Sequence, residues 1–201
     1  MALFKSVWDR SKSLTLVPAD TWETVKLEDS TVPDLLREYV FPGTFIPTAA
    51  SFLGRWIVGI SIPFWGTFRF SFGASFLIAL FEFAFFVGWV WLTGRLIAAL
   101  AVRFDSLDDE TAALKLTLFS VLPFWTAGAL NVFPVLHILV VIFGLYCIYI
   151  FYHGLPVLLE TPSDKVLPFA LLATAGALIL YAVGTAILSG IAGVFGPHFH
   201  P

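Results

Sequence analysis

The chain has 201 residues, of which 59% are hydrophobic and 12% are charged, and its formal net charge is −3. Soluble domains are about 45–50% apolar and about 25% charged, and one core of this size could not hide so much apolar surface, so the composition excludes a soluble fold. The acidic balance argues against a nucleic-acid partner, and the lone Cys147 allows no intrachain disulfide. We therefore predict an integral membrane protein.

Residues 1–42 read as a polar N-terminal arm on the cytoplasmic side of the membrane. They begin without an apolar core segment, so we expect no cleaved signal peptide. Four apolar residues recur at helical spacing beside lysine and arginine: Leu3, Phe4, Val7 and Trp8. This pattern predicts a helix lying on the membrane surface, although a solvated, partly ordered arm is the alternative. Thr31, Pro33 and Asp34 resemble a capping box that opens a second helix.

Residues 43–201 contain five apolar segments, each long enough for the roughly 20 residues that a membrane crossing needs. Their approximate bounds are Gly43–Phe64, Gly73–Val102, Ala112–Asn131, Pro134–Leu155 and Val166–Phe195. We therefore predict an all-α integral membrane fold, a five-span bundle in one compact domain. The first segment is the least regular, because it contains Pro47 and Arg55. The third and fourth are joined only by "NVFP", which predicts a tight antiparallel hairpin.

Lysine and arginine placement predicts the orientation of the bundle, because these residues accumulate on the cytoplasmic side. The arm carries Lys5, Arg10, Lys12, Lys26 and Arg37. With five spans, Arg103, Lys115 and Lys165 fall on the same side as the arm, and only Arg69 falls on the other. We therefore expect the N-terminus in the cytoplasm and the C-terminus outside.

Arg55 and Glu82 lie at matching depths in two neighbouring antiparallel spans. Arg55 is nine residues before Phe64, and Glu82 is nine residues after Gly73. An ionisable residue at this depth costs roughly 2.5–3.5 kcal/mol on insertion scales, so we expect the two to form an intramembrane ion pair. Our interpretation is that the pair holds two helices together; the alternative is a relay for protons or ions.

The sequence contains no G-x-S-x-G, H-E-x-x-H, Walker or dinucleotide-binding motif. We therefore predict no enzyme, no catalytic residue, no cofactor and no metal. His198 and His200 form an H-x-H pair in the C-terminal tail, which is weak evidence for a metal site.

An acidic run, "DSLDDE", precedes the third span and lacks the spacing of a calcium-binding loop. We expect Ser106 or Asp108 to cap the third span. Asp109 and Glu110 would then favour the positive end of its helix dipole.

The connector between the fourth and fifth spans reads "YHGLPVLLETPSDK", from Tyr152 to Lys165. Gly154 and Pro156 predict the end of the fourth span, since proline removes a backbone donor and disfavours helical geometry before it. Thr161, Pro162 and Asp164 predict the start of the fifth, with Thr161 as the N-cap. Upstream, tyrosines at 146, 149 and 152 fall on one slowly drifting helix face.

This region also resembles the signature of the Yip domain family, the Ypt/Rab-interacting membrane proteins and their bacterial relatives. The residues that match are Tyr146, Tyr149, Tyr152, Gly154, Leu155, Pro156, Pro162 and Lys165. Three further segments resemble the bacterial branch in the expected order: "TWETVKLEDSTVPDLLREYVFPGTFIPTAASFLG", "GTFRFSFG" and "LKLTLFSVLPFWTAGALNVFPVL". His153 and Glu160 fall at variable-looking positions, and Glu82 is a departure of this chain.

The resemblance implies five spans, a cytoplasmic N-terminus and a C-terminus on the other side. Eukaryotic members are implicated in vesicle traffic and in binding prenylated Rab GTPases, whereas the bacterial members have no settled role. The short arm looks like the bacterial type, which implies a bacterial inner membrane.

We therefore predict a non-enzymatic scaffold or interaction protein. Its arm and two cytoplasmic connectors would bind protein partners, with Tyr152, His153 and Lys165 as the first candidates. One alternative is an accessory subunit of a larger, energy-transducing membrane complex. Another is a small transporter or channel that uses Arg55 and Glu82. The sequence leaves the small-molecule ligand and the oligomeric state open.

Overall fold

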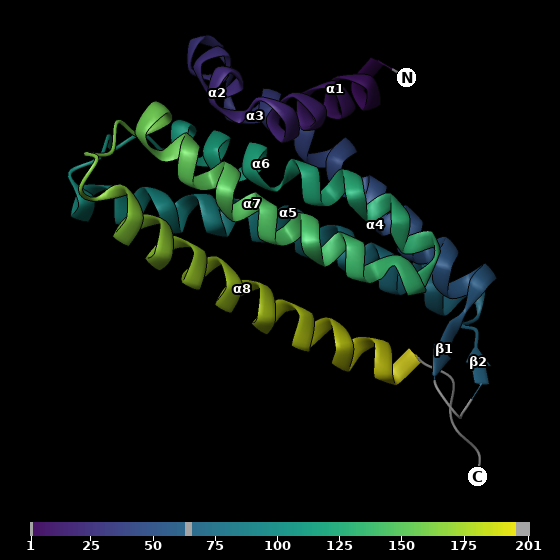
Figure 1. The fold of residues 1–201 in the computed structure, drawn as a ribbon. Coiled ribbons are helices and arrows are strands. Elements are labelled where there is room, and N and C mark those ends of the chain that lie inside the picture. Colours follow the sequence, from purple (N-terminus) through teal and green to yellow (C-terminus); the bar gives the residue numbers. More distant parts are fainter. Residues whose placement is uncertain (1, 63–65, 196–201) are drawn as a thin grey trace.

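The computed structural model describes residues 2–62 and 66–195, and Figure 1 shows their arrangement. The predicted end of the first span at Phe64 and the H-x-H pair at 198 and 200 lie outside the described residues. Within them, four helices are long and apolar enough to cross a membrane. These are α5 (Phe72–Ala101), α6 (Glu110–Ala127), α7 (His137–Leu158) and α8 (Val166–Phe195).

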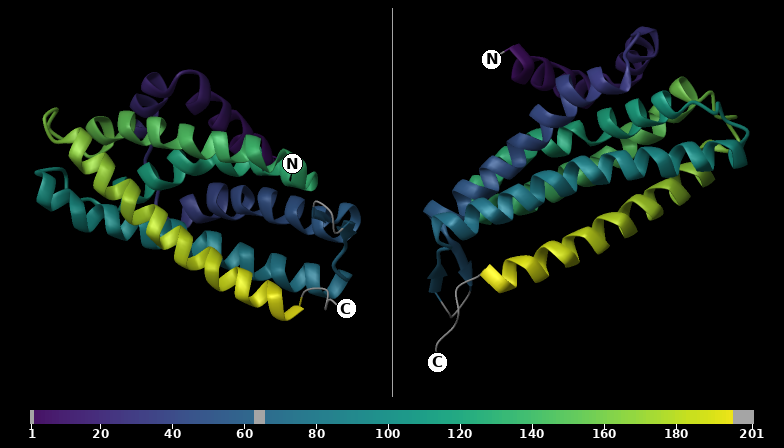
Figure 2. Two further views of the ribbon diagram at one scale, coloured as in Figure 1. Left: turned by 60° about the horizontal axis from the view of Figure 1, so that its bottom comes forward. Right: turned by 180° about the vertical axis from the view of Figure 1, so that it is seen from behind.

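The arm folds into α1 (Ala2–Leu16), α2 (Pro18–Leu27) and α3 (Val32–Leu35), which lie across one side of the bundle (Figures 1 and 2). Helix α1 packs on α6, and α2 packs on α7. Val7, Ser11 and Leu14 are buried and share one face at helical spacing. Trp8 is 60% exposed on another face. The apolar pattern of α1 therefore serves the bundle through Val7, while Leu3, Phe4 and Trp8 point outward.

The expected capping box at the start of α3 is confirmed. The Thr31 hydroxyl accepts from the Asp34 backbone N–H, and the Asp34 carboxylate accepts from the Thr31 backbone N–H at 3.1 Å. Hydrogen bonds from the Thr31 side chain and backbone lower the pKa of Asp34 below its usual value. Helix α3 thus starts where the sequence predicted a helix.

The first predicted span has a different end in the structure. The chain is helical from Val32 to Val58 through α3, the π-helical turn η1 (Leu36–Val40), α4 (Phe41–Leu53) and a second π-helical turn, η2 (Gly54–Val58). Gly59 then takes φ 85°, a conformation that favours glycine and ends the helix. An antiparallel hairpin follows, β1 (Ile60–Ile62) and β2 (Gly66–Phe68), with Ile62 opposite Gly66. The fold is therefore helical with one short β-hairpin, and helix does not continue to the expected end.

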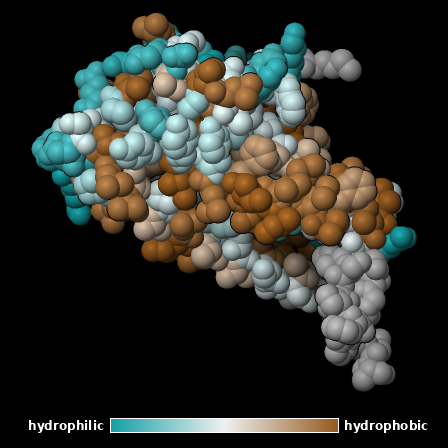
Figure 3. Space-filling model, in the orientation of Figure 1, coloured by the Kyte–Doolittle hydropathy of each residue, from teal (hydrophilic) through white to brown (hydrophobic). Residues whose placement is uncertain are grey.

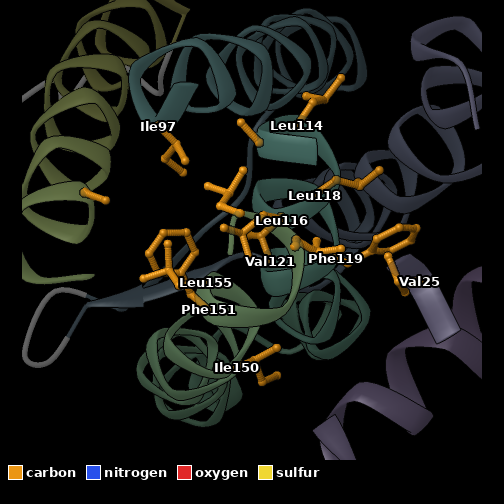
Figure 4. Close-up of a cluster of buried hydrophobic side chains, with 14 of the residues drawn as sticks. Val25, Ile97, Leu114, Leu116, Leu118, Phe119, Val121, Ile150, Phe151 and Leu155 are labelled. Atoms are coloured by element: carbon orange, nitrogen blue, oxygen red, sulfur yellow. The ribbon is translucent and has the colours of Figure 1, made fainter. Parts of the chain in front are cut away.

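Helix α6 lies at the centre of the bundle, between α1, α4, α5 and α7. Its side chains form much of the core, which Figure 4 shows around Leu116, Leu118 and Phe119. Helix α8 packs mainly along α5 and contacts α7 less. The remaining links are short 3-10 segments: η3 (Val102–Phe104), η4 (Gly128–Val132) and η5 (Pro134–Leu136). Figure 3 shows hydrophilic residues over the arm and hydrophobic residues over the helices below it.

Three expected capping or end signals were wrong, although the expected start of the fifth span at Val166 is confirmed. Asp109, rather than Ser106 or Asp108, caps α6, because its extended backbone lets Oδ1 accept from the N–H groups of the next turn at 2.8 and 3.0 Å. Helix α7 continues past Pro156 to Leu158, since a proline in the last turn forfeits only one helical bond. Helix α8 begins at Val166, and Thr161 does not cap it.

Candidate functional site

Two ends of the bundle carry the candidate residues. The connector end is formed by the α5–α6 connector (residues 102–109), the α7–α8 connector (residues 159–165) and the C-terminal end of α2. The hairpin end is formed by η2, the β-hairpin and the start of α5. The two ends lie at opposite sides of Figure 1. The motif residues Tyr146 to Lys165 occupy α7 and the connector end, and Arg55 lies at the hairpin end.

The motif glycine Gly154 is the place where the arm meets the bundle. Trp22 of α2 is fully buried, and its Nε1 donates to the carbonyl of Ile150 on α7 at 3.0 Å. A Cβ on Gly154 would lie 2.5 Å from Cδ1 of Leu116 and 2.7 Å from Cε2 of Trp22. Contacts this short do not occur between real side chains, so the arm can dock only because residue 154 has no side chain.

The three motif tyrosines divide between the arm and the surface. The Tyr146 hydroxyl donates to the carbonyl of Thr15 at 2.8 Å and so holds the α1–α2 junction. Tyr149 stacks on Tyr146, with ring centroids 5.4 Å apart, and meets the His153 ring edge-on at 4.4 Å. Tyr149 is 49% exposed and Tyr152 is 38% exposed. One tyrosine therefore fixes the arm, and the other two form an exposed aromatic row that includes His153.

The two connectors are tied directly to each other. The N–H of Leu107 donates to the carbonyl of Leu159 at 2.8 Å, and the hydroxyls of Ser106 and Thr161 are 2.9 Å apart. Thr161 is occupied in this way because the connectors pack together, which explains why it does not cap α8. Lys165 forms an ion pair with Asp105 across the same junction. The two connectors therefore form one continuous surface.

The arm is joined to this surface by further polar contacts. Lys26 pairs with Glu160 of the α7–α8 connector at 2.9 Å. Arg10 pairs with Glu28 inside the arm and ties α1 to the end of α2. Lys115, counted in the sequence among the cations on the same side as the arm, is only 8% exposed, and its Nζ donates to the carbonyl of Glu28. A buried lysine needs such a partner, because desolvation of its charge is costly. The arm therefore supplies an acceptor that α6 requires.

At the hairpin end, Arg55 and Glu82 meet as the depth argument expected. Nη1 lies 2.6 Å from Oε1, and Nη2 lies 2.9 Å from Oε2, a two-point geometry that is among the stronger forms of ion pair. The side chains are only 13% and 19% exposed. Both carboxylate oxygens are engaged, so the arrangement joins η2 to α5 and leaves little capacity for a transferred ion.

The remaining predicted residues have packing roles or lie at the surface. Leu155 is fully buried in the core, and Pro156 is exposed on the last turn of α7. Pro162 is half-buried, and its carbonyl accepts from the Lys165 N–H at 2.8 Å. Across the described ranges, no group of three or more His, Cys, Asp or Glu side chains could hold a metal ion.

Sequence reasoning missed the arm side of this site, namely Trp22, Glu28 and Tyr39. Tyr39 packs edge-on against Phe119, with centroids 4.9 Å apart, and the Arg10 guanidinium lies 5.3 Å from the Phe119 ring centroid. The sequence did contain one signal of this contact, because Trp22 is an isolated tryptophan in a polar helix. A large aromatic side chain contributes strongly to the energy of the contact in which it is buried.

Comparison with known proteins identifies the architecture but no individual relative. The Yip1 domain matches residues 12–187, which include the arm from the last residues of α1 onward and most of α8. Neither a curated protein nor a solved structure matches the chain.

Proposed function

The chain belongs to the Yip1 domain family, and on this premise we propose that it is a non-enzymatic membrane protein that binds other proteins through its arm and connectors. The observation that supports this most is the docking of Trp22 against the motif glycine Gly154. A motif that fixes a polar arm onto a membrane bundle organises a surface for contact. It does not assemble reacting groups.

The proposed binding surface is the connector-end surface. We define it by the following exposed or half-exposed residues: Leu27, Arg103, Leu107, Tyr149, Tyr152 and His153. Leu27 is 86% exposed and Leu107 is 46% exposed, beside the Lys26–Glu160 and Lys165–Asp105 pairs. Apolar side chains rimmed by charges are typical of interaction sites, and aromatic residues are enriched in them.

We further propose that the connector-end surface faces the cytoplasm of a bacterial inner membrane and that the chain crosses five times. The helical run Val32–Val58 would be the crossing that comes first in the chain, in addition to α5 through α8. Its 27 residues span about 40 Å at 1.5 Å per residue, which exceeds the hydrocarbon core of about 30 Å. The positive residues of the arm and connectors support this side.

Affinity purification in mild detergent, followed by mass spectrometry of the co-purifying chains, tests the interaction role. Leu27→Glu should remove partners, because it replaces an apolar side chain of the connector-end surface that is 86% exposed with a charged one. Leu3→Glu is the matched control, since Leu3 is also exposed on the arm but lies at the far end of α1. Retention of the same partners by both variants would refute the proposed surface. Recovery of a stable multisubunit assembly would favour an accessory subunit.

Lys165 needs a paired design because it already binds Asp105 within the chain. Lys165→Glu breaks that pair and also changes the surface charge. Combining it with Asp105→Lys restores the pair with its charges exchanged. Partner binding lost in the single variant and recovered in the exchanged one would assign Lys165 a structural role. Loss in both would assign it to the partner contact.

A further inference from the structure

A cavity of about 350 Å³ lies among α5, α6, α7 and α8, away from the connector-end surface. Pockets of about 300–1,000 Å³ are the usual size for small ligands. The cavity exists because α8 packs mainly along α5 and contacts α7 less, which leaves space between α7 and α8. In Figure 4, Ile97, Val121 and Phe151 come from three different helices around this side of the core.

The cavity is a groove with a closed floor and a lateral opening. Its floor includes Ile97 of α5 and Val121 of α6, which are 2% and 8% exposed. Its rim includes Leu145 of α7 and Leu178 of α8, which are 65% and 57% exposed. Residues that line the groove and are also exposed therefore stand on α7 and α8, so the groove opens between those two helices.

The shape of the groove is long and parallel to the helices. Along α7 the lining runs from His137 to Phe151, and these fourteen steps of 1.5 Å each make about 21 Å. Its described lining contains no Asp, Glu, Lys or Arg. All four helices are long and apolar enough to cross a membrane, so the opening faces hydrocarbon and not water.

We propose that this groove binds one acyl chain of a membrane phospholipid. The groove carries no Asp, Glu, Lys or Arg in its described lining, runs along the helices and is lined mostly by apolar side chains, with the hydroxyls of Thr93 and Ser120 as polar groups on its floor. A groove of this form that opens sideways to the bilayer matches an extended hydrocarbon chain. A void of this size left empty would forfeit the contacts of every atom that lines it. The inference does not depend on the proposed interaction role.

The test uses the full chain in vesicles that contain phosphatidylglycerol with a photoactivatable diazirine at the end of one acyl chain. After illumination, the labelled peptides are mapped by mass spectrometry. We expect labelling of Leu145, Ile148 and Leu178 at the groove to exceed labelling of Leu171 and Ile179, which are exposed on α8 but do not line it. Equal labelling of both groups would overturn the proposal.

A groove-filling variant with a matched control sharpens the result. Ala177→Phe places a ring in the groove, whereas Ala175→Phe places the same ring at an exposed position two residues earlier on α8, outside the lining. Groove labelling should fall about tenfold in the first, the change that 1.4 kcal/mol of lost affinity produces, and stay unchanged in the second.

A second groove-filling variant keeps the proposal testable if Ala177→Phe does not fold. Gly144→Leu fills the groove from α7, and its Cβ would meet only the Phe124 ring at 3.4 Å, an ordinary contact. Variants are compared only where thermal unfolding in detergent matches the unmodified chain. Unchanged labelling in a folded filling variant, or a crosslink between two chains through α7 and α8 in place of lipid labelling, would overturn the proposal.

Discussion

Gly154 has a packing role in this fold. It lies within α7, and its missing side chain makes room for Trp22 from α2 and Leu116 from α6. Residue 154 is therefore a three-way contact among the arm and the two helices of the central hairpin. A change there should act on the arm before it acts on the bundle.

Gly154→Ala should loosen the arm. The added Cβ would lie 2.5 Å from Leu116 and 2.7 Å from Trp22, and overpacking of this kind typically costs about 1–3 kcal/mol. We expect faster proteolysis between α2 and α3 and a lower unfolding temperature. Gly88→Ala is the control, because nothing lies within 4 Å of its added Cβ and alanine favours helix by about 1 kcal/mol. Equal behaviour of the two variants would contradict this role.

The sequence predicted some residue contacts and not others, for a physical reason. Arg55 and Glu82 were paired correctly although the helix ends at Val58 and not at Phe64. Two ionisable residues in neighbouring antiparallel apolar segments each need a partner, and long side chains tolerate an error of a few residues in the count. Trp22 and Gly154 could not be paired, because their contact depends on how the arm packs across α7, and no local spacing encodes that. The burial of Lys115 could not be predicted for the same reason, since its carbonyl partner at Glu28 lies on the arm.

Among the helices, the predicted second to fifth spans correspond to α5 through α8 within a few residues. Their long apolar runs define them, whereas their ends depend on tertiary contacts. Asp109 caps α6 and Thr161 binds Ser106, because the two connectors pack together. The end of the first span was harder to predict, because the backbone turn at Gly59 ends its helix. A count of apolar residues does not reveal such a turn.

The helix pair η2 and α5 should depend on its ion pair for stability. Glu82→Gln leaves Arg55 without its charge partner, and removing one member of a buried pair costs about 3–5 kcal/mol, less here because both side chains keep some exposure. Replacing both, with Arg55→Met and Glu82→Leu, should recover most of the loss. Thermal unfolding of the three variants in detergent measures this. If Glu82→Gln were stable but abolished proton flux in liposomes, the relay alternative would be correct.

For the whole molecule, the position of the arm constrains how the bundle can sit in a bilayer. Ser11 of α1 hydrogen-bonds Thr126 at 2.7 Å, and Thr126 is one residue from the end of α6 that lies away from the connectors. Thr126 comes sixteen residues after Glu110, the first residue of α6, and this separation is about 24 Å along the helix. Helix α1 also carries the exposed Lys5 and Asp9. Charged side chains at that depth are costly in hydrocarbon, and this cost opposes the docking of α1 through the buried Val7, Ser11 and Leu14. We expect the cost of the charges to exceed the gain from docking when lipid surrounds the bundle, so that α1 leaves α6 while Trp22 stays near the connector end.

Single cysteines introduced into a Cys147→Ser background test this placement in sealed vesicles of known orientation. With five crossings, cysteines at Asp29 and Leu107 should react with an impermeant maleimide from one side, and a cysteine at Arg69 should react only from the other. A cysteine at Lys12 should react from the same side as Asp29, because α1 has moved to the surface on that side. If the cysteines at Asp29 and Arg69 reacted from the same side, residues 32–58 would not cross the membrane. Protection of Lys12 from both sides would show that α1 stays on α6, and the face of α6 beneath it would then be shielded from lipid by the arm.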